Sequence, residues 1–513
     1  MLFNSYIFIF LFLPPVWIAY WLLRGRTRST GLAALVLASL FFYGYWDVRF
    51  LPLLLLSIAT NFAIGRALHR EGRPSRQRKM WLLVGIVFNL GLLGFFKYTN
   101  FFSEIAESLT GTPLISFHIL LPIGISFFTF QQITYLVDIY RGEAERYSLL
   151  HYMLFISFFP QLIAGPIVHH AEMMPQFLKA PRPAWGAVAL GLSTFIAGLF
   201  KKLVLADNIA PLASAVFSAA DAGQPVSMVE SWSALTAFSF QMYFDFSGYS
   251  DMALGLGLMF GIRLPINFHS PYKARTVAEF WRRWHMTLGR FLSDYIYLPL
   301  GGSRQGDFKT MRNLMVVMAA SGIWHGAGWG FVIWGLLNGL WLWVNFLSLR
   351  FHALIGMPGR SLIPGVVAQV MMFTAVTFDW AFFRANTVDG MLSMSSAALG
   401  LQGLTIPAAF EAPFGPVADL LKQMGAVFSG PNHVGLGDWA TLGAPFILLS
   451  FVIVWALPNT NQIFLAQDDG FDITPARRIV WRPTLAGFAA VSGTFVVALL
   501  FASSISEFLY FQF

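Results

Sequence analysis

The sequence predicts an all-α polytopic membrane protein whose residues 1–513 form a single membrane-embedded domain. Its 513 residues are 57% hydrophobic and only 11% charged, whereas a soluble domain carries about 25% charged residues. Apolar stretches near the length of a membrane-spanning helix recur along the chain, and basic residues gather in a few segments between them. A lipid bilayer accepts such apolar surface directly, so these observations favour one long membrane domain over several soluble ones.

The candidate membrane spans follow from length, because about 20 apolar residues are needed to cross about 30 Å of hydrocarbon. They are residues 5–23, 31–46, 50–66, 80–96, 119–139, 184–204, 231–260, 313–347, 364–385, 443–457 and 484–503. Because 231–260 and 313–347 exceed one simple span, each predicts a tilted helix, a broken helix or two short helices, which gives about 11 to 13 membrane segments. Residues 5–23 precede Arg24, whereas a secretory signal has its basic residues first, so we expect an uncleaved helix.

Basic clusters follow the first, third and fifth predicted spans. Positive residues favour the cytoplasmic side of a membrane, so the N-terminus is expected to face away from the cytoplasm. An alternative makes 66–79 a patch for nucleic acid or anionic lipid. We expect no nucleic-acid partner despite the net charge of +8, because basic clusters in a membrane protein report topology first. The clusters are Arg24, Arg26 and Arg28; Arg66, Arg70, Arg73, Arg76, Arg78 and Lys79; and Arg141 and Arg146.

The chain has no cysteine, which excludes disulfides, thiol catalysis, cysteine-ligated zinc and a thioester on this chain. Its ten histidines are not spaced as a zinc ligand set, so no metal is expected. The sequence also lacks Gly-x-Ser-x-Gly, Walker-loop and His-Glu-x-x-His motifs. The chemistry is therefore sought among histidines and carboxylates in apolar surroundings.

Three segments interrupt the apolar pattern. Residues 150–175 contain Pro160 and Pro166 and predict a re-entrant or interfacial segment, which is tolerated where protein or water covers the backbone. Residues 262–310 are the most polar central stretch, where chemistry is expected, and residues 401–441 predict an extramembrane loop.

The first candidate site is a run of tryptophan, arginine and histidine. On one helix, Trp281, Trp284 and His285 would share a face, while Arg282 and Arg283 would point elsewhere. Tryptophan beside basic residues is also typical of a membrane-interface belt, and composition alone favours that structural interpretation.

The second candidate site is a glycine-rich run around His325, within 313–347. A histidine at bilayer depth is costly and is a functional candidate by default. Gly322, Gly326 and Gly328 would let another backbone or a ligand approach closely. The alternative is helix packing through small residues, with the histidine bonded to a neighbouring helix.

Two carboxylates, Asp245 and Asp251, lie in an apolar block. Six residues apart on one helix, they would point to different faces, so we expect each to hold a neighbouring cation or helix terminus. Histidine is the better candidate for a general base, because its pKa of about 6.5 lies near working pH. Acyl transfer to a hydroxyl needs such a base and a donor for the developing oxyanion.

Several motifs together resemble the bacterial membrane-bound O-acyltransferases, in particular their polysaccharide-acetylating branch, which includes alginate acetylation. Residues 281–285 and 294–302 resemble the central signature of that family, and 324–326 resembles the motif of its catalytic histidine. The separation of the two histidines is typical of the family. Further matches are residues 1–5, 96–98, 244–251, 267–268, 378–384 and 508–513, so the resemblance runs nearly from end to end.

The resemblance implies a ring of tilted helices around a central funnel in a bacterial inner membrane, where the N-terminus that the basic clusters place away from the cytoplasm would be periplasmic. It implies an O-acyltransferase that takes an acetyl group from a cytoplasmic thioester, acetyl-CoA. A periplasmic SGNH-hydrolase-like partner would pass the acetyl group to an exopolysaccharide such as alginate. His325 would be general base or transient acyl carrier, and His285 would orient it, bind the thioester or move a proton. Expected tunnel-lining residues are Trp281, Trp284, Trp324, Trp329, Asp245, Tyr249 and Asn267, and expected donor-binding residues are Arg282, Arg283 and Lys273.

Three alternatives stay open at this stage. A D-alanyl transferase would use the same fold with a carrier protein as donor, and a lipid- or protein-acylating relative would prefer a long-chain donor. A solute transporter would show donor-independent flux, and its inverted repeats and paired broken helices are not evident in the sequence.

Overall fold

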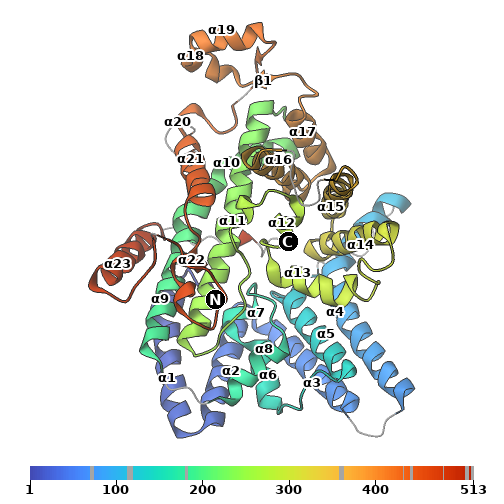
Figure 1. Ribbon diagram of the computed structural model, residues 1–513, viewed down its shortest axis with the longest axis vertical. Helices are drawn as coiled ribbons and strands as arrows, with labels where there is room; N and C mark the ends of the chain where they lie inside the picture. The colour runs from blue at the N-terminus through green and yellow to red at the C-terminus, as the bar shows by residue number, and fades with distance from the viewer. Residues whose placement is uncertain are drawn as a thin grey trace. The chain divides into compact units, whose positions relative to one another are not determined.

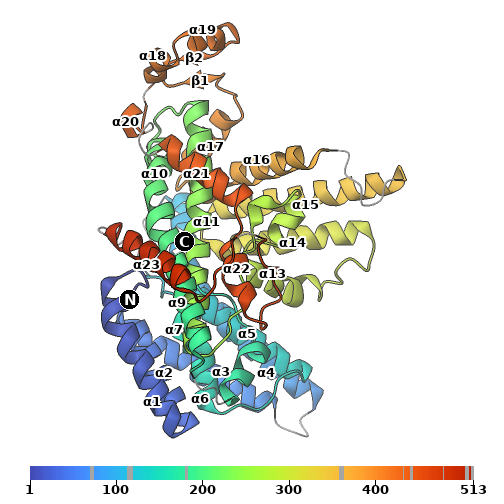
Figure 2. The same cartoon turned by 60° about the vertical axis from the view of Figure 1, so that its left-hand side comes forward.

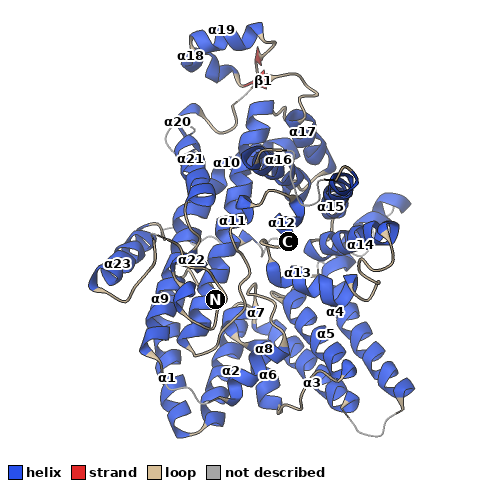
Figure 3. Ribbon diagram, in the orientation of Figure 1, coloured by secondary structure: helices blue, strands red, loops and turns tan. Residues whose placement is uncertain are grey.

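The computed structural model describes residues 1–69, 74–111, 119–179, 183–356, 363–430, 432–438, 443–477, 479–502 and 508–509. Arg70, Arg73 and residues 510–513, which entered the predictions above, lie outside these ranges. The chain forms two compact units, residues 1–200, 248–267 and 460–512 (unit one) and residues 201–247 and 268–459 (unit two). The units are interleaved along the chain, and a single domain stays a prediction. Helices make up almost all of the regular structure, as Figures 1 and 3 show.

Unit one is a set of helices that pack side by side. Helices α3, α4 and α5 contact one another, α1 packs on α2, and α9 packs on α23 (Figure 1). Thr27, Ser148 and Thr484 cap the first turns of α2, α6 and α23 with a side-chain oxygen that accepts a backbone N–H. The elements are η1 (Ile7–Phe12), α1 (Leu13–Arg26), α2 (Arg28–Gly44), η2 (Val48–Phe50), α3 (Leu51–Leu68), α4 (Ser75–Thr110), α5 (Ile125–Arg141), α6 (Leu149–Ser157), α7 (Phe159–Leu162), α8 (His170–Leu178), α9 (Trp185–Phe200), the end of α11 (Met228–Met259), α22 (Thr460–Ile463), η9 (Leu465–Gln467) and α23 (Leu485–Leu500).

Unit two holds the polar central stretch. In Figure 2, helices α14, α15 and α16 run alongside one another, and contacts join α14 to α15 and α15 to α16. Strands β1 and β2 pair in parallel, Thr405 with Val427 and Ile406 with Phe428. The elements are η3 (Lys201–Ala206), α10 (Asp207–Asp221), the start of α11, η4 (Pro271–Lys273), α12 (Val277–Trp281), α13 (Met286–Leu292), η5 (Ser293–Tyr297), α14 (Asp307–His325), α15 (Trp329–Leu354), α16 (Gly365–Arg384), α17 (Val388–Ala398), β1 (Thr405–Ile406), η6 (Ala408–Phe410), α18 (Glu411–Phe414), α19 (Pro416–Gln423), β2 (Val427–Phe428), α20 (Leu436–Asp438), α21 (Ala444–Phe451) and η8 (Val452–Ala456).

Helices α14 and α15 form an antiparallel hairpin. A Cβ added at Gly335 would lie 2.5 Å from the carbonyl oxygen of Met318, so glycine is needed where the two backbones meet. Further along, the indole Nε1 of Trp343 donates to the carbonyl of Met311 at 2.5 Å. At the far ends, an ion pair joins Arg350 to Asp307.

The fold confirms the helical membrane class. Six described helices are long and apolar enough to span a membrane, or up to seven if a bent pair counts as one span. This is fewer than the predicted segments, because α2 and α23 are apolar but have only 17 and 16 residues. Helices α11 and α14 contain acidic residues, and hydropathy alone does not separate such helices from those that face lipid.

The long and interrupted stretches resolve differently. All of the predicted stretch 231–260 except its last residue lies on one uninterrupted helix of 32 residues, α11, whereas 313–347 divides between α14 and α15. Residues 150–175 fall on three short helices, and every side chain from 154 to 168 is buried, so protein covers this backbone. The stretch 401–441 contains short helices and the two-stranded sheet, coloured red in Figure 3, and its place outside the membrane stays a prediction.

Candidate active site

His325 is the last residue of α14, and the same helix holds its ring. Its Nδ1 lies 2.7 Å from the carbonyl oxygen of Ser321. A carbonyl can only accept, so Nδ1 carries the proton and the lone pair of the neutral ring lies on Nε2. The residue is 7% exposed. This tautomer suits a general base that acts through Nε2.

Aromatic rings from two neighbouring helices surround this imidazole. The ring centroids of Trp334 on α15 and Phe383 on α16 lie 5.1 and 5.5 Å from that of His325. The ring centroid of Trp380, one turn before Phe383 on α16, lies 5.2 Å from that of Phe383. Such an apolar wall excludes water and strengthens any electrostatic interaction inside it.

His285 lies in a turn between α12 and α13, with φ 44° and ψ 51°. This left-handed conformation is costly for residues other than glycine, and among the described residues His285 shares a positive φ only with Ser270 and with glycines. The backbone N–H of His269 donates to the carbonyl of Arg283 at 2.9 Å, which ties the two strained turns together. The predicted shared helix face of Trp281, Trp284 and His285 is therefore wrong, because α12 ends at Trp281.

The two histidines meet at one tryptophan. The ring of Trp324 lies 4.9 Å from that of His325 and 6.1 Å from that of His285. Phe246 on α11 lies against His285 at 4.9 Å, edge to face. His285 is 2% exposed, so both imidazoles are buried in one aromatic cluster of unit two. We call His285 and His325 the histidine pair.

The other predicted tryptophans divide between this cluster and the surface. Trp281 lies 5.6 Å from Trp334, and Trp284 lies 5.8 Å from Trp380, so both join the aromatic cluster. Trp329, at the start of α15, is 55% exposed, and its role in lining a tunnel stays a prediction.

Asp245 holds a buried cation. Its carboxylate lies 2.6 Å from Nζ of Lys202, and the same ammonium lies 2.9 Å from Asp207. Both side chains of the Lys202–Asp245 pair are almost fully buried. This matches the expectation that the carboxylate holds a neighbouring cation. Sequence reasoning missed Lys202, although a lysine pair at the end of the apolar stretch 184–204 was a signal for it.

Comparison with known proteins identifies the family. The family model described as MBOAT, membrane-bound O-acyltransferase family, matches residues 114–383, which include the histidine pair. The chain belongs to the membrane-bound O-acyltransferase family. It is therefore a multi-pass acyltransferase of the membrane, as the motifs predicted.

Individual relatives of this acyltransferase differ in their acceptors. The chain is 39% identical to a peptidoglycan O-acetyltransferase of Helicobacter pylori, over 100% of this chain and 98% of the relative. It is 34% identical to a probable alginate O-acetylase AlgI of Pseudomonas aeruginosa, over the full length of both. A teichoic acid D-alanyltransferase of Streptococcus thermophilus is 27% identical over 48% of this chain and 61% of its own.

Two predicted tunnel residues of the acyltransferase belong to unit one. Tyr249 packs between Phe3 and Phe508, at 4.9 and 4.5 Å, which joins the opening and closing motifs of the sequence. The amide of Asn267 donates to the hydroxyl of Ser250 at 3.4 Å. The histidine pair belongs to unit two, so a tunnel role for these two residues stays a prediction.

Two of the three predicted donor-binding cations lie close together. Burial and then the charge of Arg283 lower the pKa of Lys273. Burial lowers the pKa of His269, and the positive charges of Arg283 and Lys273 lower it further. Arg283 is paired with Glu279 at 2.6 Å, and Lys273 donates to a backbone carbonyl. The side chain of Arg282 is exposed.

The glycines near His325 serve helix packing in this acyltransferase. A Cβ at Gly322 would lie 2.2 Å from the carbonyl oxygen of Phe331, and one at Gly326 would lie 2.0 Å from the ring of Phe331. The closely approaching group is therefore the hairpin itself, as the packing alternative expected. His325 is the last residue of α14, and the backbone turns to an extended conformation at Gly326.

Within the described ranges, no group of three or more histidine, aspartate and glutamate side chains is arranged to hold a metal ion.

Proposed function

We propose that this acyltransferase moves an acetyl group from cytoplasmic acetyl-CoA across a bacterial inner membrane, with its N-terminus in the periplasm. A periplasmic SGNH-hydrolase-like partner then delivers the acetyl group to an exopolysaccharide such as alginate. The observation that carries the proposal is the histidine pair, in which the Ser321 carbonyl fixes the proton of His325 on Nδ1. Full-length similarity to relatives named for alginate and peptidoglycan acetylation supports an acetyl group and a glycan acceptor.

The transfer step uses Nε2 of His325 as the base. Nε2 takes the proton of the attacking hydroxyl, whose oxygen forms the new ester bond to the acetyl carbon. The carbon–sulfur bond of the thioester breaks, and the departing thiolate takes the proton from the imidazolium to leave as a thiol. In the carrier alternative, Nε2 itself attacks the acetyl carbon, and the carbon–sulfur bond breaks as the thiolate leaves. The hydroxyl then attacks the acetyl carbon, the carbon–nitrogen bond breaks, and the hydroxyl proton ends on the thiolate, which restores the neutral imidazole. His285 acts as a positioning residue across Trp324.

The donor's phosphates are assigned to the cations around Lys273 and Arg283. Both lie outside the membrane-spanning helices; after burial, the charge of Arg283 lowers the pKa of Lys273, and the charges of Arg283 and Lys273 lower the pKa of His269. An anion relieves that repulsion. Lys273→Gln is expected to raise the KM for acetyl-CoA several-fold with little change in kcat, whereas the control Lys422→Gln, at an exposed lysine paired with Glu411, leaves both unchanged. Equal KM values for the two variants would contradict the assignment.

The decisive experiment measures acetyl esters on surface polysaccharide in cells that lack the protein and are complemented with variants. Wild type should restore acetylation, and His325→Gln should lower it at least about 100-fold at equal abundance in the membrane. The matched control is His352→Gln, a histidine at the far end of α15. Near-normal acetylation by His325→Gln would overturn the mechanism.

A second candidate function is D-alanyl transfer, which the partial similarity to teichoic acid D-alanyltransferases favours. The purified protein would then bind an acyl carrier protein more tightly than acetyl-CoA. Acetyl-ester analysis of peptidoglycan beside that of exopolysaccharide, in the same cells, decides between the acceptors named for the full-length relatives.

A further inference from the structure

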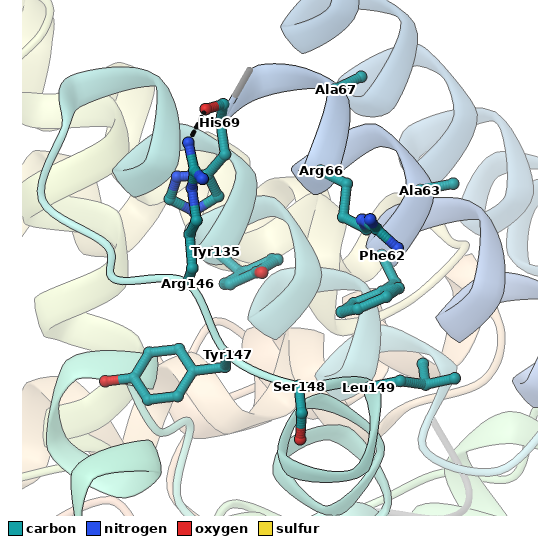
Figure 4. Close-up of a pocket in the computed structure, with 10 residues that line it drawn as sticks. All are labelled: Phe62, Ala63, Arg66, Ala67, His69, Tyr135, Arg146, Tyr147, Ser148 and Leu149. Atoms are coloured by element: carbon teal, nitrogen blue, oxygen red, sulfur yellow. Dashed lines mark hydrogen bonds between the residues drawn. The ribbon is translucent and has the colours of Figure 1, made fainter. Parts of the chain in front are cut away.

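Unit one contains a cavity of about 1100 Å³ at the end of α3 (Figure 4). Its walls come from the last two turns of α3, from α5 and from the loop that leads into α6. Neither member of the histidine pair lines it. The cavity therefore belongs to a site other than the one assigned to acyl transfer.

The cavity is cationic. The described residues that line it include Arg66, His69 and Arg146 and none that is acidic; the side chain of Glu145, next to Arg146 in the chain, bonds to the lining residue Tyr147. Burial, followed by the charges of Arg146 and Arg78, lowers the pKa of His69, so this imidazole is uncharged at pH 7. The positive charge comes from two guanidinium groups, which bind phosphate oxygens in a bidentate manner.

Backbone contacts hold the cavity in shape. Arg146 donates from Nη2 to the carbonyl of His69 at 2.8 Å, which fastens the loop to the end of α3 (Figure 4). A Cβ at Gly65 would lie 2.9 Å from the ring of Tyr135, so glycine lets this ring form the back wall. Ser148 accepts from the backbone of His151 and so fixes the start of α6. These contacts hold the last part of the loop against the end of α3 and the start of α6.

An apolar stripe on α3 leads to the cavity. Leu56, Ala59, Ala63 and Arg66 are all exposed and recur every three or four residues, so they share one helix face. The helix is part of the membrane-spanning segment Val48–Leu68. In a bilayer the apolar members of this stripe contact acyl chains, and the stripe ends at the guanidinium of Arg66 in the last turn of the helix.

We propose that this cavity binds an anionic phospholipid, with its headgroup phosphate at Arg66 and Arg146 and one acyl chain along the exposed stripe of α3. A dissolved phosphate would meet the same two guanidinium groups but would leave the stripe without a function. The combination of a cationic cavity and an apolar approach favours the lipid. The site is independent of the acyl-transfer chemistry proposed above.

The test uses the full chain purified in nanodiscs that contain equal amounts of phosphatidylglycerol and phosphatidylcholine. Lipid that stays bound after transfer to detergent is quantified by native mass spectrometry. Wild type should retain phosphatidylglycerol preferentially, and Arg66→Gln should reduce that preference about fivefold. The matched control is Arg26→Gln, because Arg26 is also an exposed arginine in the last turn of a membrane-spanning helix.

Further variants keep the test decisive. Arg66→Lys retains the charge and should keep most of the preference, and Arg146→Gln should lose it as Arg66→Gln does. Equal retention of the two lipids by wild type, or an equal loss in Arg66→Gln and Arg26→Gln, would overturn the proposal. A soluble phosphate is the other possible occupant. If wild type showed no lipid preference in the mixed discs but bound inorganic phosphate through Arg66 in discs of phosphatidylcholine alone, the site would be assigned to a soluble phosphate and the proposal would be overturned.

Discussion

The buried ion pair between Lys202 and Asp245 allows a test of whether Asp245 serves the fold or the reaction. The substitution Asp245→Asn keeps the shape of the side chain and removes its charge. The two side chains are only 2% and 3% exposed, and removing one partner of a buried pair costs about 3–5 kcal/mol. Lys202 keeps its contact with Asp207 at 2.9 Å, so the lower end of that range, about 3 kcal/mol, is expected.

The assay is equilibrium unfolding of the purified protein in mixed micelles, combined with acetyl transfer per folded molecule. Asp245→Asn should lower the free energy of unfolding and leave transfer by the folded fraction intact. The control is Asp307→Asn, which breaks the exposed ion pair to Arg350, with side chains 54% and 57% exposed. An exposed pair contributes at most about 1 kcal/mol and often nothing measurable.

A double substitution sharpens the argument. Lys202→Met with Asp245→Leu replaces the pair by apolar groups, which is often neutral or stabilising, and the side chain of Asp207 is 19% exposed and can be hydrated. The double variant should therefore be more stable than Asp245→Asn. If Asp245→Asn instead abolishes transfer while its free energy of unfolding is unchanged, the structural role is refuted and Asp245 belongs to the reaction.

Three further substitutions test the packing around the histidine pair and within unit one. Gly322→Ala should destabilise the protein by about 1–3 kcal/mol through overpacking, because its Cβ would lie 2.2 Å from the carbonyl of Phe331. Ser321→Ala should leave acetyl transfer unchanged, because the acceptor for Nδ1 of His325 is the backbone carbonyl. Asn89→Ala should cost about 1–3 kcal/mol, because the buried amide that pairs with it loses its partner.

Thermal midpoints and transfer assays of the purified variants check these outcomes. Gly328→Ala is the control for Gly322→Ala. A Cβ at Gly328 would lie 3.6 Å from Phe331, which is an ordinary contact, and the backbone there is extended, with φ −174°. A large loss of transfer in Ser321→Ala would show that its hydroxyl, not its carbonyl, serves the imidazole. For Asn89→Ala, restored stability in the double variant Asn61→Leu, Asn89→Leu would show that the loss comes from the amide left without its partner.

The sequence predicted the helices best where apolar residues ran without interruption, as in α3 and α16. Helix α10 was not predicted, because Asp207 and Pro211 interrupt its run of apolar residues. Other segments of the protein pack against this helix. The sequence placed the break within 313–347 only as one of several alternatives, since three glycines allow a break but do not require one. In the structure the break falls at Gly326, whose backbone is extended, and the ring of Phe331 on α15 packs against it.

The candidate site was predictable in its histidines but not in its geometry. His325 was identified by its depth and its motif, and the structure adds the tautomer. The conformation of His285 was not predictable, because a left-handed residue between two short helices follows from contacts made by His269 and Trp284 rather than from local propensity. Trp329 was also expected in the site, and the exposure of its side chain leaves that expectation a prediction.

The hairpin of α14 and α15 also decides how the rest of the chain is oriented. Because its far ends are joined by the Arg350–Asp307 pair, the chain leaves the hairpin at the same level at which it entered. Counting residues 313–347 as one crossing would therefore reverse the sidedness of every later loop, including 401–441. Reporter fusions placed after Gly306 and after Ile355 should report the same compartment, so an even number of crossings lies between them.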